Sequence, residues 1–469
     1  MSFSIRLGEH KKILIVGDLI LVNLTTLFAF WIMAARANWE FSRAYLAINA
    51  GWFVLLSALW FGSAFLNGLY DPKRTTDLTT TGVILLRSAM LMIVIYVLIY
   101  FFFATPGSVP RGVVGYQGAA SVIVIALWRT LYILALQRPA FARPVIIVGA
   151  GWAGQTIAQA IHQSAGAHYR IVGFVDDDPA KLGQPIGENP AMPVIGASRD
   201  LARLVKHHSV PEVILAITHN LHTTLFQALL DCKEQGAQIT LMPVLFEQLT
   251  GQVPIEHIGD NWNIALPLDS AEAGGFYPIA KRVFDITGAL IGLALLLPFF
   301  PLIALAIRLD SRGPIFYSQA RVGKGGKVFN LIKLRTMGTD AEADGHAQRA
   351  QTNDPRITRV GRLLRKMRLD EMPQLINILK GDMSAVGPRP ERPEHLAELD
   401  RVIPFHRLRN AVKPGMAGWA VVNYDYIDSV ADARIRLQYD LYYIKHQSLM
   451  LDISILLRTM GHMVMLKGR

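Results

Sequence analysis

Two neighbouring carboxylates, Asp370 and Glu371, are the residues best suited to chemistry in this chain of 469 residues. Five arginines recur at intervals of three just before them: Arg356, Arg359, Arg362, Arg365 and Arg368. On a helix this spacing produces a basic stripe, and nearby arginines lower the pKa of a carboxyl group. We therefore expect both carboxylates to be ionised. Such a pair suits phosphoryl chemistry, because it can bind a hard divalent cation or attack an electrophile.

Other residues suited to binding phosphate lie on both sides of the pair. Lys333-Leu-Arg335 and Arg321 precede it, and Gly387-Pro-Arg389-Pro follows it. A turn stiffened by prolines presents the Arg389 guanidinium as a fork for bidentate phosphate binding. Two carboxylates standing alone would read as ion-paired residues at a helix end. In this setting, a site for a phosphorylated substrate is favoured.

The charge of the chain is concentrated in the same region. From Lys281 to the end there are 29 Lys and Arg against 18 Asp and Glu, which accounts for the whole net charge of +11. This region therefore favours anionic partners such as lipid headgroups or phosphorylated small molecules. No nucleic-acid-binding motif is present, so nucleic acid is not expected as a partner. The single cysteine, Cys232, excludes a disulfide framework and indicates a reducing compartment.

Four apolar stretches near the N-terminus predict four membrane spans, because each approaches the ~20 residues that cross hydrocarbon as a helix. They are Ile13–Ala35, Tyr45–Leu66, Val83–Ala104 and Val113–Leu136. The flanking bases expected on one side are Arg6, Lys11, Lys12, Lys73, Arg74, Arg138 and Arg143, against Arg36, Arg43 and Arg111 on the other. This bias places both ends of the bundle in the cytoplasm. Arg87 and Arg129 fall inside spans, where snorkelling or helix pairing is the favoured explanation.

Short β-rich runs then alternate with helical ones, which predicts a parallel α/β domain. The strands are expected at Val145–Val148, Ile171–Val175, Val213–Ile217 and Ile239–Met242. A dinucleotide-type fingerprint, Gly149-x-Gly151-x-x-Gly154, lies between the first strand and a helix, with Asp176 at the end of the next strand. Such glycines let a pyrophosphate approach a helix N-terminus, or they simply form a tight turn. A bound nucleotide is therefore left open, and we expect a structural or regulatory domain.

A fifth apolar segment, Phe284–Ile307, contains Pro298 and Pro301 past its middle. Proline breaks or kinks a helix, and basic residues flank both ends of the segment. We expect a re-entrant hairpin that returns to the cytoplasmic face, in preference to a fifth span. The expected fold is a membrane α-helical bundle of four spans, a Rossmann-like α/β domain and a mixed, mainly α catalytic domain with a re-entrant membrane helix. The expected boundaries are 1–140, 141–268 and 281–469, with the hairpin at 283–308.

The region from Lys281 onward resembles the bacterial sugar transferases, which are polyprenyl-phosphate hexose-1-phosphate transferases that prime exopolysaccharide and O-antigen synthesis. The motifs that carry the resemblance are Lys281-Arg-x-Phe-Asp285, the break at Pro298, Lys333-Leu-Arg-Thr-Met337, Leu369-Asp-Glu-Met-Pro-Gln-Leu375, Gly381-Asp-Met-Ser384, Gly387-Pro-Arg-Pro390 and Pro414-Gly-Met-Ala-Gly-Trp419. The preceding spans and α/β domain are similar to the long form of the family.

The resemblance implies that Asp370 is the nucleophile and Glu371 the ligand of Mg²⁺ or Mn²⁺. It places Arg365 and Arg389 on phosphates, with Lys333, Arg335 and Arg321 in the same site. The implied substrates are a UDP-hexose and undecaprenyl phosphate, at the cytoplasmic face of the bacterial inner membrane. Trp419-Ala-Val421 and Asn423-Tyr424 depart from the pattern of glucose-priming members, which leaves the sugar open. A homodimer is also left open.

Two other functional classes remain as alternatives. A membrane-bound NAD-dependent nucleotide-sugar dehydratase or oxidoreductase would use the glycine fingerprint catalytically. Against it, the one Tyr-x-x-x-Lys spacing, Tyr277 to Lys281, stands at the entrance of the apolar hairpin rather than beside the α/β domain. A non-catalytic scaffold for polymer export would leave the phosphate-type motifs without a role. Release of UMP from UDP-hexoses separates these classes.

Overall fold

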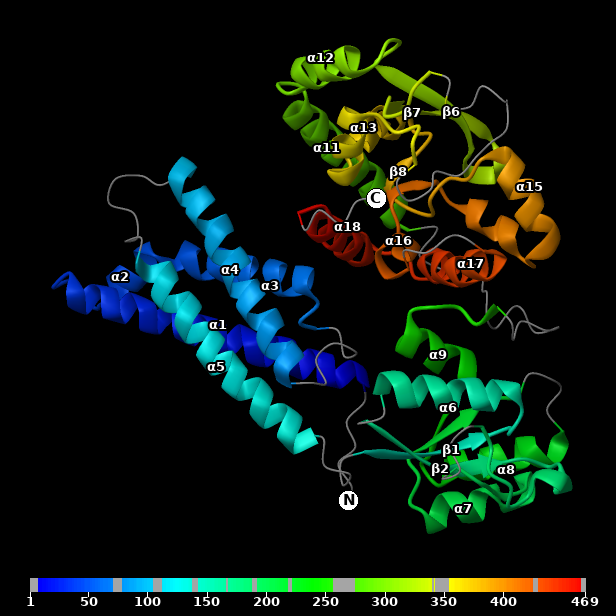
Figure 1. Ribbon diagram of the computed structural model, residues 1–469. Coiled ribbons are helices and arrows are strands. Elements are labelled where there is room, and N and C mark those ends of the chain that lie inside the picture. Colours follow the sequence, from blue (N-terminus) through cyan, green and yellow to red (C-terminus); the bar gives the residue numbers. More distant parts are fainter. Residues whose placement is uncertain are drawn as a thin grey trace. The chain divides into compact units, whose positions relative to one another are not determined.

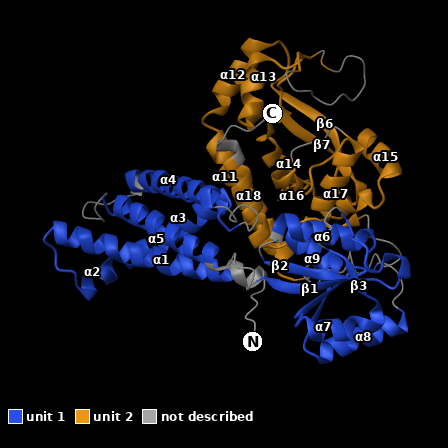
Figure 2. Cartoon of the chain, turned by 60° about the horizontal axis from the view of Figure 1, so that its bottom comes forward, with its two compact units in different colours: residues 1–250 blue, residues 251–469 orange. Residues whose placement is uncertain are grey.

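The fold is described from a computed structural model in which two compact units are distinguished, residues 1–250 and 251–469 (Figures 1 and 2). The residues described are 7–70, 78–103, 112–136, 142–165, 168–187, 192–217, 222–255, 275–339, 341, 354–424 and 429–464. The expected boundaries at residues 140, 141 and 268 lie outside them, as do Arg6, Lys73, Arg74, Arg111, Arg138 and Arg469.

A helical bundle forms the N-terminal part of the first unit (Figure 1). Its helices are α1 (Leu7–Arg36), α2 (Arg43–Ile48), α3 (Ala50–Asn67), α4 (Leu78–Phe103) and α5 (Gly112–Leu136). Four of these helices, all but the short α2, are long and apolar enough to cross a membrane. The four predicted apolar stretches are therefore confirmed as helices. The second is divided at Asn49, which ends α2 before α3 begins.

A buried ion pair joins the first and last helices of the bundle. Arg129 on α5 donates to Asp18 on α1 at 2.6 Å, and the Tyr70 hydroxyl donates to the same carboxylate oxygen at 2.8 Å. Both charged side chains are almost fully buried. Helix pairing is therefore confirmed as the explanation for Arg129, whereas Arg87 is exposed on the outside of α4.

An α/β domain completes the first unit. Its five parallel strands have the spatial order β3-β2-β1-β4-β5. They are β1 (Arg143–Val148), β2 (Tyr169–Val175), β3 (Val194–Gly196), β4 (Glu212–Leu215) and β5 (Gln238–Leu241). The helices are α6 (Trp152–Ala165), α7 (Leu201–His207), α8 (Thr223–Glu234) and α9 (Met242–Thr250). Separate apolar clusters involve α6 and α9 on one side and α7 and α8 on the other. The parallel sheet is confirmed, and the short β3 was not predicted.

The second unit begins its described helices with two apolar ones, α11 (Tyr277–Leu296) and α12 (Phe300–Asp310). They are bent by 65° relative to each other. Pro298 lies in the break between them, as the sequence predicts. The bent pair is either a broken span or a re-entrant loop by its length and composition. Membrane re-entry therefore remains a prediction.

Small sheets and short helices build the remainder of this unit. An antiparallel pair, β6 (Phe316–Val322) and β7 (Val328–Leu334), is followed by the parallel pair β8 (Ser384–Val386) and β9 (Gly415–Ala417). The helices are α13 (Arg359–Lys366), α14 (Gln374–Lys380), α15 (Pro393–Val402), α16 (Trp419–Asn423), α17 (Val430–Lys445) and α18 (Leu449–Val464), with 3-10 turns η7 (Leu369–Glu371) and η8 (His406–Ala411).

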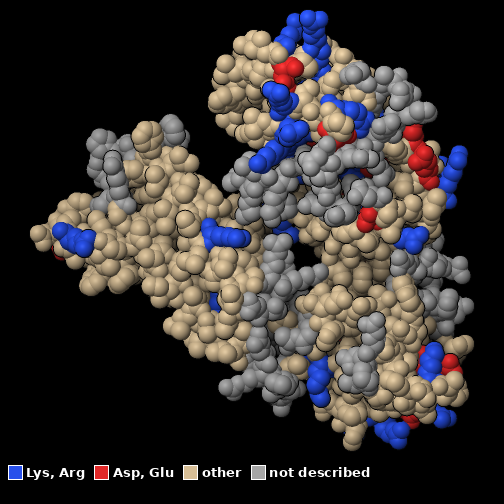
Figure 3. Space-filling view, in the orientation of Figure 1, with Lys and Arg blue, Asp and Glu red and all other residues tan. Residues whose placement is uncertain are grey.

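The charged side chains are distributed unevenly over the surface. In Figure 3 the visible face of the helical bundle carries few of them, whereas Lys and Arg gather over the upper part of the second unit. A surface poor in charge suits lipid, and a basic one suits anions. This distribution agrees with the charge excess after Lys281.

Candidate active site

A change of backbone direction presents the two carboxylates. Helix α13 begins at its N-cap Thr358, whose hydroxyl accepts from the Gly361 N–H at 3.0 Å, and it ends at Lys366. Arg368 then adopts a left-handed conformation with φ 54°, and the 3-10 turn η7 carries Asp370 and Glu371. A left-handed residue other than glycine is strained, which is common at functional sites. The turn places both carboxylates at the end of β7, beside Lys333.

Close contacts fix α13 against the end of β7. A Cβ on Gly361 would lie 2.2 Å from the Thr336 carbonyl oxygen, so only glycine permits this approach. Arg365 donates from Nε to the Thr336 hydroxyl at 2.8 Å. On the other side, the Asp310 carboxylate accepts from the Val360 N–H at 2.8 Å. The helix is therefore held both by the β7 motif and by the end of α12.

Helix α14 is fixed to β7 by one buried amide. Asn377 accepts from the Ile332 N–H at 3.1 Å and donates to the Asn330 carbonyl at 2.8 Å. Its side chain therefore satisfies two backbone groups on β7. Since α14 follows Glu371 directly, this contact sets the position of the pair relative to Lys333.

Glu371 is held by three cations. Its Oε1 accepts from Arg389 at 2.7 Å and from Lys333 at 3.3 Å, while Arg368 lies 3.8 Å from Oε2. Burial opposes its ionisation, but the charges of Arg389 and Lys333 outweigh burial and hold the Glu371 pKa well below its usual range. Burial in turn lowers the pKa of Lys333. Glu371 is therefore an ionised, oriented carboxylate.

Asp370 differs from its neighbour, since it forms no hydrogen bond or ion pair with any residue that the structure describes. Burial, with a further contribution from the Glu371 charge, raises the Asp370 pKa to about 6. The expectation that both carboxylates have lowered pKa values is therefore wrong for Asp370, although Arg365 and Arg389 do act to lower its pKa. Its desolvation and the adjacent negative charge outweigh Lys333 and Arg365. A carboxylate with little stabilisation is a better nucleophile than one bound by cations.

The five arginines do not form one stripe beside the pair. Arg356 precedes α13 and binds Asp354 at 2.6 Å. Arg359 and Arg362 are exposed on α13. Only Arg365 and Arg368 approach the carboxylates, because the helix ends before Arg368 and the chain turns there.

Two of the predicted phosphate-site residues make other contacts. Arg335 donates to the carbonyl oxygens of Arg312 and, at 2.7 Å, of Ser311, so its contacts fasten the end of α12. Arg321 donates to the Pro390 carbonyl at 3.0 Å. Burial lowers the Arg321 pKa to about 10. Of the predicted phosphate-site residues, Lys333, Arg365 and Arg389 therefore lie at the carboxylate pair. Arg321 binds the residue that follows Arg389, and Arg335 binds the end of α12 instead.

A buried charge cluster behind Arg389 was not predicted. Arg409 donates to the Arg389 carbonyl at 3.0 Å and to Asp440 at 2.9 Å. Arg436 donates to Glu391 at 3.1 Å. Burial opposes ionisation of Glu391, but Arg436 and Arg409 hold its pKa at about 2. Because Arg409 lies on η8 and Arg436 and Asp440 lie on α17, far along the chain from Arg389 and Glu391, no local spacing signals their convergence.

The glycine fingerprint forms the expected turn between β1 and α6. Gly149 has φ 102°, and a Cβ on Gly154 would lie 1.9 Å from the Gly149 carbonyl oxygen, whereas a Cβ on Gly151 would meet nothing within 4 Å. Asp176 accepts from the Ala150 N–H at 2.7 Å and pairs with Lys181 at 3.2 Å. The acidic residue of the fingerprint is therefore already engaged within the domain.

Two protein families match the chain. The family described as "Bacterial sugar transferase" matches residues 276–466, which include the whole of the site above. The family described as "CoA-binding domain" matches residues 65–243. A UDP-glucose:undecaprenyl-phosphate glucose-1-phosphate transferase from Xanthomonas campestris pv. campestris is 31% identical over 360 residues, 75% of this chain and 73% of that relative. The chain belongs to the bacterial sugar transferase family.

Other members of the family match over different lengths. The Escherichia coli (strain K12) enzyme with the same name is 30% identical over 71% of this chain and 74% of its own length. A UDP-N-acetylgalactosamine-undecaprenyl-phosphate N-acetylgalactosaminephosphotransferase from Aeromonas hydrophila is 44% identical over 213 residues, 45% of this chain. That match spans only about half of the Aeromonas relative, 49%. All three relatives are transferases, so an oxidoreductase is not favoured.

Among the described residues, no group of three or more His, Cys, Asp or Glu side chains is arranged to hold a metal. Mg²⁺ does not require such a group, because it is often bound by one or two carboxylates together with substrate phosphates. Oε2 of Glu371, which lies 3.8 Å from Arg368, is an oxygen donor of the kind that Mg²⁺ prefers. The donor set therefore fits a metal shared with a substrate.

Proposed function

We propose that this chain transfers a sugar 1-phosphate from a UDP-sugar to undecaprenyl phosphate, with release of UMP. The observation that carries the proposal is the unequal carboxylate pair, in which Asp370 is free of protein partners among the described residues while Glu371 is held by Arg389 and Lys333. The named relatives use UDP-glucose or UDP-N-acetylgalactosamine. The donor is thus a UDP-hexose or UDP-N-acetylhexosamine.

The reaction proceeds in two steps through Asp370. A carboxylate oxygen attacks the sugar-proximal phosphorus, and the bond from that phosphorus to the bridging oxygen breaks, so that UMP leaves with the electron pair. A phosphate oxygen of the lipid then attacks the same phosphorus, and the bond to Asp370 breaks to regenerate the free carboxylate. One small site can thereby serve a soluble donor and a membrane acceptor in turn, with ping-pong kinetics.

The cations of the site lower the cost of bringing a carboxylate to an anionic diphosphate. Arg389 and Lys333 are oriented by Glu371, and Arg365 by Thr336. Fixed positive groups of this kind stabilise charge that moves onto the phosphoryl oxygens and the leaving group. Mg²⁺ or Mn²⁺ held by Glu371 would supply further neutralisation of the diphosphate.

The acceptor lipid requires the site to lie at a membrane surface. We place α11 and α12 in the membrane as a hairpin that enters and leaves by the cytoplasmic face of the bacterial inner membrane. Support comes from the 65° bend at Pro298 and from the apolar residues exposed on both helices. Asp310 and Arg335 join the end of this hairpin to α13 and β7, which carry the site.

The middle domain has a structural or regulatory role in this proposal. Its five parallel strands have the order β3-β2-β1-β4-β5, and the family that matches it is described as "CoA-binding domain". Oδ2 of Asp176 already accepts from the Ala150 N–H and from Lys181, and the domain presents no catalytic Tyr–Lys pair in its sequence. We therefore assign no catalytic step to a nucleotide or coenzyme A in this domain.

Brief incubation of the purified protein with UDP-sugars labelled in the β-phosphate, without lipid, tests the proposal. Wild-type protein is expected to retain label and release one equivalent of UMP. Asp370→Asn keeps the shape without the nucleophile, and both signals should fall by at least about a thousandfold. Glu371→Gln should retain some labelling, with a weakened response to Mg²⁺. The same labelling in Asp370→Asn as in wild type would exclude the covalent route.

The donor panel also separates the functional classes. UDP-glucose and UDP-N-acetylgalactosamine are both included, because the relatives differ in this respect. Release of UMP with transfer of label to undecaprenyl phosphate supports the transferase. A change in absorbance of bound NAD that depends on sugar, without UMP, would support the oxidoreductase.

A further inference from the structure

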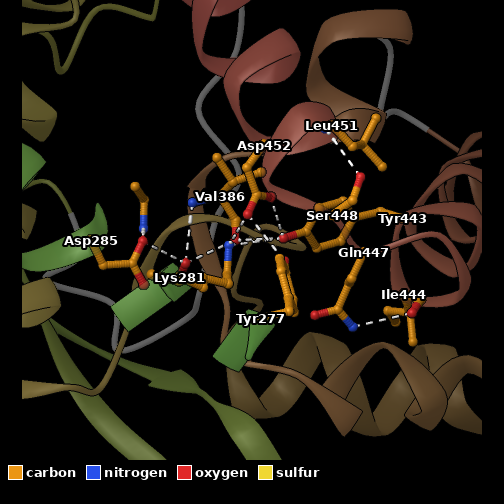
Figure 4. A network of polar contacts seen from close by, with 12 residues as sticks. Tyr277, Lys281, Asp285, Val386, Tyr443, Ile444, Gln447, Ser448, Leu451 and Asp452 are labelled. Carbon is orange, nitrogen blue, oxygen red and sulfur yellow. Dashed lines mark hydrogen bonds and ion pairs between the residues drawn. The ribbon is translucent and has the colours of Figure 1, made fainter. Parts of the chain in front are cut away.

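A buried cluster joins the start of α11 to the last helix, α18 (Figure 4). Asp452 is fully buried, and its Oδ2 accepts from Lys281 at 2.8 Å and from the Tyr277 hydroxyl at 3.0 Å. The Tyr443 hydroxyl donates to Oδ1 of Asp452 at 2.8 Å and lies 3.1 Å from the Val386 carbonyl oxygen. Both oxygens of the Asp452 carboxylate are thus bound, and the charge of Lys281 is neutralised inside the protein by this carboxylate.

Two neighbours of Lys281 on α11 bind other segments. Arg282 donates to the Ile378 and Leu379 carbonyls, at 2.7 and 2.8 Å, at the end of α14. Asp285 accepts from the Ser384 hydroxyl and from the Ala385 N–H, both at 3.0 Å. The base of α11 is therefore bonded to α14, to β8 and, through Asp452, to α18.

These contacts hold the two segments next to the Arg389–Glu371 contact, namely α14 after Glu371 and β8 before Arg389. Helix α14 begins three residues after Glu371, and β8 ends at Val386, three residues before Arg389. The chain between has little freedom, because Gly387 donates to the Ala417 carbonyl at 2.9 Å and the Pro388 carbonyl accepts from Gly415 at 2.9 Å. A shift of β8 against α14 would change the distance between the two side chains.

We propose that Lys281 and Asp452 are positioning residues, which hold the base of α11 against α18 and thereby keep in place the Asp285 contacts that fix β8, so that Arg389 stays on Glu371. This inference rests on the proposed function, in which Arg389 binds the donor diphosphate. The rival role for Lys281 is that of a basic residue that only orients the hairpin in the membrane. In that case, removal of the Lys281 charge changes the membrane topology or the amount of folded protein, and the position of Arg389 against Glu371 stays the same.

Asp452→Asn is the main variant, since it keeps the shape and removes the charge. Lys281→Met/Asp452→Asn is the second variant, since it leaves no buried charge unpaired. Asp432→Asn is the matched control, because the Asp432 carboxylate accepts from the Ser429 N–H and hydroxyl at the start of α17 and from the Tyr424 hydroxyl, and neither of these residues belongs to β8. Each full-length protein is compared by amide hydrogen exchange and by UMP release.

Loss of the Asp452 charge is expected to accelerate hydrogen exchange at the Val386 and Gly387 amides at least about tenfold. The KM for the UDP-sugar should rise by a similar factor, with a smaller change in kcat. In an Arg389→Lys background the Asp452→Asn effect on KM should disappear, because both changes act through one contact. Asp432→Asn should lower the Tm without either effect.

Exchange at the Val386 and Gly387 amides that matches wild type in both variants would overturn the inference. So would KM effects of Asp452→Asn and Arg389→Lys that simply multiply. The hydrogen-exchange comparison needs no substrate. If wild-type protein releases no UMP from any donor, the proposed function fails, while exchange still decides whether Asp452 fixes β8.

Discussion

At the scale of single residues, the unequal environments of Asp370 and Glu371 are the central feature. One carboxylate is held by Arg389 and Lys333, whereas the other has no such partner among the described residues. Adjacent like charges in a buried site push the two pKa values apart, and this separation assigns their roles. The held group orients cations, and the free group is left to react.

The raised Asp370 pKa predicts the pH dependence of the first step. Since Asp370 attacks as the carboxylate in the proposed mechanism, labelling of the enzyme should be half-maximal near pH 6 and fall as the pH drops further. The Arg365 charge lowers the Asp370 pKa, so Arg365→Gln should move this limb to higher pH. Single-turnover labelling rates from pH 4 to 8 measure the apparent pKa of Asp370 in wild type and in Arg365→Gln. A wild-type limb near pH 4, the usual value for a carboxyl group, would contradict this assignment.

The residues that touch the carboxylates were largely predictable from sequence, because phosphate-type residues recur within short motifs around the pair. Lys333, Arg365 and Arg389 were predicted in this way. The different environments of Asp370 and Glu371 were not predicted. They depend on burial and on which carboxylate oxygen faces Arg389, and the sequence reveals neither. Arg335 was misjudged for the same reason, because its motif neighbours reach the site while its own side chain turns to the end of α12.

At the scale of elements, the left-handed turn at Arg368 separates α13 from the catalytic turn η7. Glycine adopts this conformation without strain, asparagine tolerates it, and a β-branched residue does not. Arg368→Gly and Arg368→Asn should therefore retain the fold, losing only the interaction 3.8 Å from Glu371. Arg368→Val should cost about 1–3 kcal/mol and reduce UMP release at least tenfold further. Equal activity of the Val and Gly variants would show that the turn is unimportant.

The glycine turn of the middle domain gives a matched pair of variants. A Cβ at position 154 would lie 1.9 Å from the Gly149 carbonyl oxygen, so Gly154→Ala should destabilise the domain by about 2 kcal/mol or more. Gly151 has open space around its Cβ position, so Gly151→Ala should leave the Tm unchanged. Thermal unfolding measures both. If Gly151→Ala instead abolished binding of coenzyme A or NAD detected by calorimetry, the domain would bind a nucleotide after all.

The existence of the long helices and of most parallel strands was predicted correctly, whereas the residues at which elements begin and end were predicted less well. The long apolar runs and alternating β-rich runs carry strong periodic signals, whereas β3, with three residues, carries none. The five-arginine interval suggested one helix, yet α13 spans only Arg359–Lys366, because Thr358 caps its start and Arg368 turns its end. Asp18 was missed within an apolar run, although its partner Arg129 was noticed.

At the scale of the whole molecule, a returning hairpin predicts that Arg312 faces the cytoplasm, opposite the exposed Arg43 at the start of α2. Single cysteines at these positions, in a Cys232→Ser background, test this with an impermeant reagent. In intact spheroplasts Arg43→Cys should react and Arg312→Cys should not, and both should react after lysis. Reaction of Arg312→Cys in intact spheroplasts would make the bent pair a fifth span.

The bent pair α11 and α12 also bears on how the protein can be prepared. Its apolar side chains remain widely exposed, including Ile279 at 64%, Leu295 at 67%, Leu302 at 68% and Leu309 at 79%. Contiguous apolar surface of this kind aggregates in water unless it is covered. A truncated protein without the first four long helices should therefore still need detergent or nanodiscs for extraction, and should partition into the detergent phase. The catalytic unit carries its own requirement for lipid.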